Sequence, residues 1–270
     1  MELILEHGRS ERNYWRDLWR FRELFYILAW RDLTVRYKQT AIGVAWALLK
    51  PGLTMLVFVG FRKITKMSVT GVPDPIFVLA ALLPWMFFST ALAEAANSLI
   101  GNANLISKVY FPRIIIPAGA VVTSLVDFLI TLSLLAVLLV WYQFLPGWQI
   151  IMLVPLVLLT FALSVGTGLL LASLNVKYRD FRYIVPFIVQ FGLFVSPIAI
   201  SAADLPERWR FLYSLNPMVG IIDAFRWAIC RGTPPLDFTA LAMSVIITAV
   251  FLMLGIWFFR RTEKTFADVI

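Results

Sequence analysis

Three ionisable side chains fall within apolar stretches of this sequence and are the first candidates for chemistry. Glu94 and Asp127 each lie inside a long apolar run, and Lys50 lies in another, directly before Pro51. Several such groups in a row at membrane depth can relay protons, whereas an isolated one usually bonds to a neighbouring helix. Two separate acids make a poor relay, so we expect structural hydrogen bonds and keep ion coupling as the alternative. An ion pair between Lys50 and one of these acids stays open.

Metal, redox and ATP chemistry are not expected within this chain. His7 and Cys230 are the only histidine and the only cysteine, which excludes a multi-histidine metal site, an intrachain disulfide and a thiolate cluster. The sequence lacks the G-x-x-x-x-G-K-[ST] phosphate loop and the G-x-S-x-G, H-E-x-x-H and C-x-x-C motifs. We therefore predict no catalytic residues, no metal and no cofactor here, and a membrane-bound transferase has no candidate site.

The composition places these residues in a membrane. The 270 residues are 60% hydrophobic and 15% charged, with a mean hydropathy of +0.82, far more apolar than an average soluble domain. One crossing needs about 20 helical residues, so we predict an all-α integral membrane protein, one domain over residues 1–270 with six transmembrane helices. The predicted spans are residues 41–61, 75–100, 114–142, 148–174, 184–200 and 238–259.

A helical pattern also marks the segment before the first span. In residues 11–38, helical geometry places Tyr14 and Phe25 on an apolar side and Arg20 on the opposite side. This pattern predicts an amphipathic helix at the cytoplasmic membrane interface, and packing of the same face on a partner is the alternative.

The segment between the last two spans, residues 201–237, is neither a span nor a plain loop. Its apolar part, Pro217 to Ile229, has a helical pattern but is only about 13 residues long, too short to cross. We expect short re-entrant or external helices there.

The basic residues orient the chain. Of the 24 Lys and Arg residues, sixteen lie in the loops and termini on one side of the six-span layout and seven on the other, with Lys50 inside the membrane. Cytoplasmic segments are the richer ones, so both termini are predicted to be cytoplasmic. The formal charge of +8 then indicates basic cytoplasmic segments that contact anionic lipid headgroups, rather than binding of nucleic acid.

Aromatic side chains suggest a cargo. Sugar rings stack their C–H faces on aromatic planes, and seven aromatic residues in three spans lie near charged or proline-broken positions. We hypothesise that a glycan channel is lined by Trp46, Trp85, Phe87, Phe88, Phe187, Phe191 and Phe194.

Several strings, in this order, resemble the permease subunit of polysaccharide ABC exporters, the O-antigen, teichoic-acid and capsule export family. The resemblance covers essentially the whole chain. Its strings are RDL at 31–33, RYKQT at 36–40, Gly43, Trp46, Pro51, LPWMFF at 83–88, NLI at 104–106, KVYFPR at 108–113, YRDFR at 178–182, SP at 196–197 and NPM at 216–218.

The resemblance implies a type-2 ABC exporter fold in the bacterial inner membrane. It implies a homodimer around a central channel and two copies of a separate ATPase subunit, which would bind ATP and Mg²⁺ in place of this chain. The implied cargo is an undecaprenyl-linked, O-antigen-like polysaccharide. A drug or small-lipid exporter of the same type, or less favourably an ion-coupled secondary transporter, is the alternative.

The resemblance also assigns residues to roles. The ATPase-coupling surface would include Asn104, Lys108, Tyr110, Arg113, Tyr178, Arg179, Asp180 and Arg182. Residues where the interface helix turns into the membrane, Arg31, Asp32, Arg36 and Tyr37, would contact the ATPase or the pyrophosphate of the cargo. An external gate would include Pro197, Asn216 and Pro217.

Overall fold

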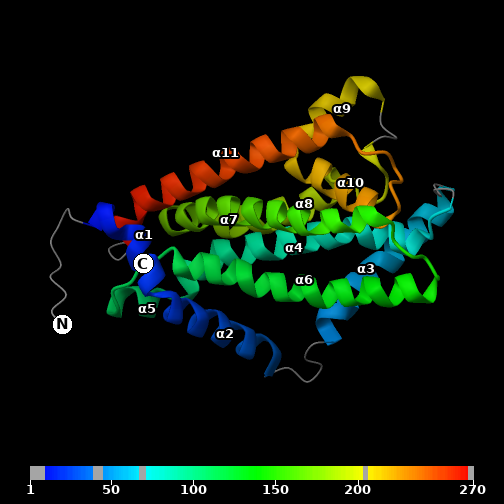
Figure 1. The fold of residues 1–270 in the computed structure, drawn as a ribbon. Helices are drawn as coiled ribbons and strands as arrows, with labels where there is room; N and C mark the ends of the chain where they lie inside the picture. Colours follow the sequence, from blue (N-terminus) through cyan, green and yellow to red (C-terminus); the bar gives the residue numbers. More distant parts are fainter. Residues whose placement is uncertain (1–9, 39–44, 67–70, 203–205, 267–270) are drawn as a thin grey trace.

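Long apolar helices lying side by side form the body of the molecule (Figure 1). The computed structural model describes residues 10–38, 45–66, 71–202 and 206–266, which form helices and turns without a strand. Five helical segments are long and apolar enough to cross a membrane. They are α3 (Ala45–Ile64), α4 (Asp74–Gly101), α6 (Ile115–Trp141), η1 (Trp148–Met152) continued by α7 (Leu153–Lys177), and α11 (Phe238–Thr262).

Helix α4 forms the core of this body. It packs against α3, α6, α7, α8 and α10, and residues 76–83 are almost completely buried. A helix that is apolar on every side is stable only when neighbours cover all of it. Pro75 lies in the first turn, where a proline costs no helical hydrogen bond. The predicted span 75–100 thus corresponds closely to α4.

Glycines let α11 approach two of its neighbours closely. A Cβ on Gly255 of α11 would lie 2.1 Å from the carbonyl oxygen of Gly166 in α7. A Cβ on Gly220 of α10 would lie 2.3 Å from the carbonyl oxygen of Ala240 in α11. Neither position has room for a side chain, so α7, α10 and α11 are in backbone-to-backbone contact.

The N-terminal segment forms two helices rather than the single one expected over 11–38. Helix α1 (Ser10–Arg20) and helix α2 (Arg22–Lys38) meet at Phe21. Tyr14 and Leu28 are buried against the ends of the long helices, whereas Arg20 is exposed. The apolar face therefore packs on the chain's own long helices, and α2 lies alongside α6 (Figure 1).

Helix α8 (Phe181–Val195) is shorter than the predicted span 184–200. Its 15 residues extend about 22 Å, less than the apolar thickness of about 30 Å. It begins earlier than predicted and ends at Val195, because Ser196 precedes Pro197 and the residue before a proline is disfavoured in a helix. The described residues thus contain five helices of spanning length and one shorter apolar helix. Residues 41–44 of the predicted first span lie outside the described residues.

Two short helices occupy the segment 201–237, of which residues 203–205 lie outside the described ranges. Helix α9 (Glu207–Ser214) is largely exposed, whereas α10 (Pro217–Ile229) is buried between α4, α7 and α11. Both lie at the end of the molecule opposite α1 and α5 (Ala103–Lys108) (Figure 1). We call the end with α1 and α5 the basic end and the other the α10 end.

Candidate functional site

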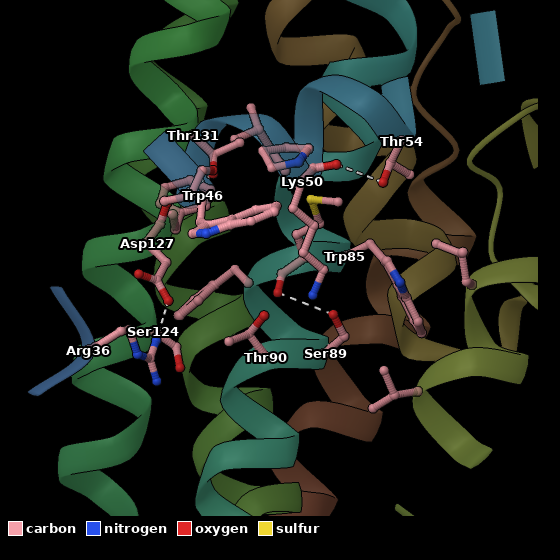
Figure 2. Close-up of a pocket in the computed structure, with 18 of the residues that line it drawn as sticks. Arg36, Trp46, Lys50, Thr54, Trp85, Ser89, Thr90, Ser124, Asp127 and Thr131 are labelled. Carbon is pink, nitrogen blue, oxygen red and sulfur yellow. Dashed lines mark hydrogen bonds and ion pairs between the residues drawn. The ribbon is translucent and has the colours of Figure 1, made fainter. Parts of the chain in front are cut away.

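A pocket of about 430 Å³ lies between α3, α4, α6 and α8, beside the last turn of α2. Figure 2 shows side chains from several helices meeting around it. Three of the predicted aromatic residues, Trp46, Trp85 and Phe87, line it. Its polar lining consists of Arg36, Tyr37, Lys50, Thr54, Ser89, Thr90, Ser124, Asp127, Thr131 and Gln190.

An ion cluster at the edge of this pocket connects α2 to the long helices. Arg36 pairs with Glu94 of α4 at 2.9 Å between Nη2 and Oε1, and with Asp127 of α6 through Nη1. The Tyr37 hydroxyl donates to Asp127 as well. Burial, followed by this hydrogen bond, raises the pKa of Tyr37, which keeps it a neutral donor. The two acids expected inside spans are therefore joined by one arginine.

Lys50 lies on the pocket wall without a carboxylate partner among the residues that the structure describes. The structure shows no ion pair of Lys50 with Glu94 or Asp127, which the sequence left open, and both acids pair with Arg36 instead. Figure 2 shows Lys50 near Trp46 and Trp85. The pocket therefore combines a cation, indole rings and hydroxyl groups. This set can bind an anionic group together with a polar ring.

The other predicted aromatic residues lie elsewhere. Phe88 is buried beside Trp85, with ring centroids 6.0 Å apart, and does not line the pocket. Phe187, Phe191 and Phe194 of α8 are exposed on its outer face, where Phe187 and Phe191 stack at 5.7 Å. The seven rings do not form one lining within this chain.

Most of the residues assigned to the coupling surface are exposed at the basic end. Ile106 anchors α5 in the core, and the outward positions are Asn104, Lys108 and Tyr110. The remaining coupling residues, 178–182, directly follow α7. Asn175 near the end of α7 donates to the Ala96 carbonyl at 2.8 Å, near the end of α4, so residues 178–182 and α5 lie at the same end of the molecule. The exposed residues there are Tyr178, Arg179, Asp180 and Arg182.

Arg113 differs from the other residues of that set because its groups are bonded inside the chain. Its backbone N–H donates to Glu263 Oε1 at 2.8 Å, and its guanidinium donates to the Glu263 carbonyl. Arg31 is also engaged, with Asp32 at 2.7 Å and with Asn102 at 2.8 Å. Arg31 therefore joins α2 to the start of α5.

The residues assigned to the external gate meet at the α10 end. Asn216 caps α10 by accepting from the Met218 N–H at 3.0 Å, and its amide donates to Ser196 Oγ at 3.3 Å. Pro197 and Pro217 adjoin these two residues, so the structure brings the three predicted positions together.

The sequence analysis missed two arginines that hold the chain after Pro197. Arg226 of α10 is fully buried and donates to the carbonyls of Ile198 at 2.5 Å and Ile200 at 2.9 Å. Arg62 of α3 donates to the intervening Ala199 carbonyl at 2.7 Å. Both guanidiniums lie over the ring of Phe77, at 4.1 and 4.3 Å from its centroid. The sequence did contain a signal for Arg226, because it is an arginine within the apolar run 217–229.

Comparison with known proteins gives consistent matches. The model of the ABC-2 type transporter family matches residues 23–230. An O-antigen export system permease protein, RfbA of Myxococcus xanthus, is 29% identical over 94% of this chain and 98% of its own length. A protein of the same name from Klebsiella pneumoniae is 24% identical over 92% and 95%. The polysialic acid transport protein KpsM of Escherichia coli is 23% identical over 87% and 91%.

Proposed function

Since this chain belongs to the ABC-2 type transporter family, we propose that it is the membrane subunit of an ATP-driven polysaccharide exporter. Its cargo is an O-antigen-like chain on an undecaprenyl pyrophosphate carrier, moved from the cytoplasmic to the outer leaflet of the bacterial inner membrane. The names of the O-antigen and polysialic acid relatives support the polysaccharide class.

The pocket is the observation that carries the lipid-linked form of the cargo. Lys50 provides a point charge for phosphate, and Trp46 and Trp85 provide planes for the first sugars. Ser89 and Thr90 add hydroxyl groups that can bond to sugar hydroxyls. A pyrophosphate joined to a sugar offers a matching set of groups, namely negative charge, a polar ring and hydroxyl groups.

Arg36, which the resemblance assigned to the pyrophosphate or the ATPase, has a different role in this proposal. It is already bound to Glu94 and Asp127 and holds α2 against α4 and α6. Such a bridge closes the pocket edge when no cargo is bound, and an incoming phosphate would compete with the two carboxylates for the guanidinium.

Energy comes from a separate ATPase in this proposal. This chain has no phosphate loop, and the exposed residues of α5 and 178–182 form a charged, aromatic surface at the basic end. One ATPase would dock on this surface in each of two copies, with both termini on the same cytoplasmic side. A rigid push on α5 would then reach the membrane helices.

A homodimer and a sixth crossing complete the proposal. Helix α8 and the Ser196–Pro197 turn would together form the sixth crossing, since α8 alone is too short. The exposed rings of Phe187, Phe191 and Phe194 support a second copy facing α8, so that the aromatic lining is completed between two chains.

The alternatives receive less support. A drug or small-lipid exporter needs a closed apolar pocket, whereas this one contains Lys50 and several hydroxyl groups. Ion coupling needs acids that can exchange protons along a path, whereas Glu94 and Asp127 are both bound to Arg36.

Affinity purification from the native host in mild detergent tests the proposal. We expect a P-loop ATPase to co-purify in equal amount, and the complex to hydrolyse ATP and move pyrophosphate-linked glycan across vesicles. Lys108→Glu with Arg179→Glu should release the ATPase, whereas Lys63→Glu, an exposed control at the α10 end, should retain it. A chain that purifies alone and transports in response to a proton gradient would refute the proposal.

A further inference from the structure

Three distant parts of the chain meet around one carboxylate, Glu263. The Arg113 N–H donates to its Oε1 at 2.8 Å, and the Arg113 guanidinium donates to its backbone carbonyl. The Tyr14 hydroxyl of α1 interacts with the same carboxylate, and Arg260 lies over the Tyr14 ring at 4.5 Å. We call Tyr14, Arg113, Arg260 and Glu263 the Glu263 cluster.

The Glu263 cluster lies on an apolar layer, with Tyr14 buried and its three charged members half-buried. Phe111 and Ile114 flank Arg113, and Phe259 and Phe266 flank Glu263, with exposed fractions of 7% or less. Burial raises the pKa of the Glu263 carboxyl, and the bond from the Arg113 N–H, together with the nearby Tyr14 hydroxyl, opposes that shift. A carboxylate that is partly removed from water is tolerated where donors receive it, so these bonds hold the 109–114 loop against the end of α11.

The two elements joined at Glu263 lead to opposite ends of the molecule. The 109–114 loop directly follows α5, which presents Asn104 and Lys108. Helix α11 has 25 residues and runs about 37 Å toward the α10 end, as Figure 1 shows. There Gly220 of α10 lies against Ala240 and Ser244 of α11 without space for a Cβ.

A displacement of α5 would therefore reach α10 through close contacts only. The hydrogen bonds of Glu263 connect the loop to the end of α11, the helix itself is stiff, and the Gly220 contact connects it to α10. Packed elements of this kind shift as units rather than deform continuously. No other described carboxylate bonds to the 109–114 loop.

We infer that Glu263 is a positioning residue that passes movement of the α5 loop to α11 and thereby to the helices at the α10 end. This inference rests on the proposed function, since an ATPase moves α5 only in the complex. Glu263 touches no cargo in this role and acts through Arg113 and Tyr14.

The first test uses the whole complex, reconstituted with its ATPase in vesicles. We expect Glu263→Ala to lower the amount of glycan transported per ATP hydrolysed by about ten-fold, because it removes the charged acceptor of the Arg113 N–H, while assembly and ATP hydrolysis stay within two-fold. Glu263→Gln keeps an acceptor for the Arg113 N–H and should restore most of the ratio. Glu23→Gln, an exposed acid at the start of α2, is the matched control. An unchanged ratio in Glu263→Ala, or a proportional loss of transport, hydrolysis and assembly, would overturn the inference.

The second test needs no ATPase and therefore separates failure of this inference from failure of the proposed function. Hydrogen exchange is followed in the membrane subunit alone, in lipid nanodiscs. We expect Glu263→Ala to speed exchange both in the 109–114 loop and in α10, about 37 Å away along α11. A change confined to the loop and the end of α11 would overturn the inference, whatever the wild-type complex does with ATP.

Discussion

Removal of the Arg226 guanidinium should destabilise the α10 end strongly. Arg226→Met keeps a long apolar side chain over Phe77 but removes the donors to the carbonyls of Ile198 and Ile200. It also leaves Asp223, which lies 3.4 Å from Nη1, without its buried counterion. The segment after α8 then loses two of the bonds that hold it on α10.

The structure sets the size of this effect. Breaking a buried ion pair by removing one partner costs about 3–5 kcal/mol. Asp223 still accepts from the Ala202 N–H at 3.2 Å, so we expect the lower value, about 3 kcal/mol. For a chain of this size, that corresponds to a fall of about 6–12 °C in Tm. Asp223→Asn added to Arg226→Met removes the uncompensated charge and should recover about 1 kcal/mol.

Thermal unfolding followed by tryptophan fluorescence in one detergent measures both variants. Arg208→Met removes an exposed arginine of α9 and should leave Tm unchanged, since exposed charges contribute little. The reasoning is refuted if Arg226→Met unfolds within about 1 °C of the wild type, or if the double variant is less stable than the single one.

Three other substitutions test separate features. Gly255→Ala places a Cβ 2.1 Å from a backbone oxygen of α7 and should cost about 2 kcal/mol in thermal unfolding, whereas Gly60→Ala, with nothing within 4 Å, should cost nothing. Lys50→Gln should raise the transport KM for pyrophosphate-linked glycan about ten-fold without changing ATP hydrolysis, and an unchanged KM would exclude Lys50 from phosphate binding. Arg36→Gln should lower Tm because two carboxylates lose their shared cation, and adding Asp127→Asn should restore part of it; additive losses would contradict this.

Helix limits were predictable where apolar runs end at charges or prolines. Asp74 and Pro75 begin α4, and Arg260 and Arg261 lie in the last turn of α11, close to the predicted limits. At α8 the proline mark is present at Pro197, but the predicted span ran on to residue 200 because residues 198–200 are apolar again. Composition reports which residues avoid water and not which of them are helical, so hydropathy alone placed this limit too late.

The sequence predicted which types of residue line the candidate site, but not which of its residues contact one another. Trp46, Trp85 and Phe87 were expected near cargo, and they line the pocket. The bridge from Arg36 to Asp127 joins residues 91 positions apart, and the bond from Arg113 to Glu263 joins residues 150 apart. Periodicity and motif order describe neighbours along the chain, so they carry no information on such pairs. Glu263 in particular follows a span as an ordinary charged flank would.

The distribution of packing indicates which parts can move against each other. Helices α7, α10 and α11 touch backbone to backbone at Gly166, Gly220 and Gly255, so they form one rigid unit. Helix α8 packs on α4 and α7, and the ring of Trp85 in α4 lies 2.4 Å from where a Cβ of Gly192 would be. Because Trp85 also lines the pocket, movement of α8 necessarily changes the pocket wall. Movement transmitted through Glu263 acts on the rigid unit of α7, α10 and α11. The pocket lies outside this unit, between α4 and the less tightly packed α3 and α8. Relative movement of these two parts would therefore open the pocket and shift the α10 end in one step.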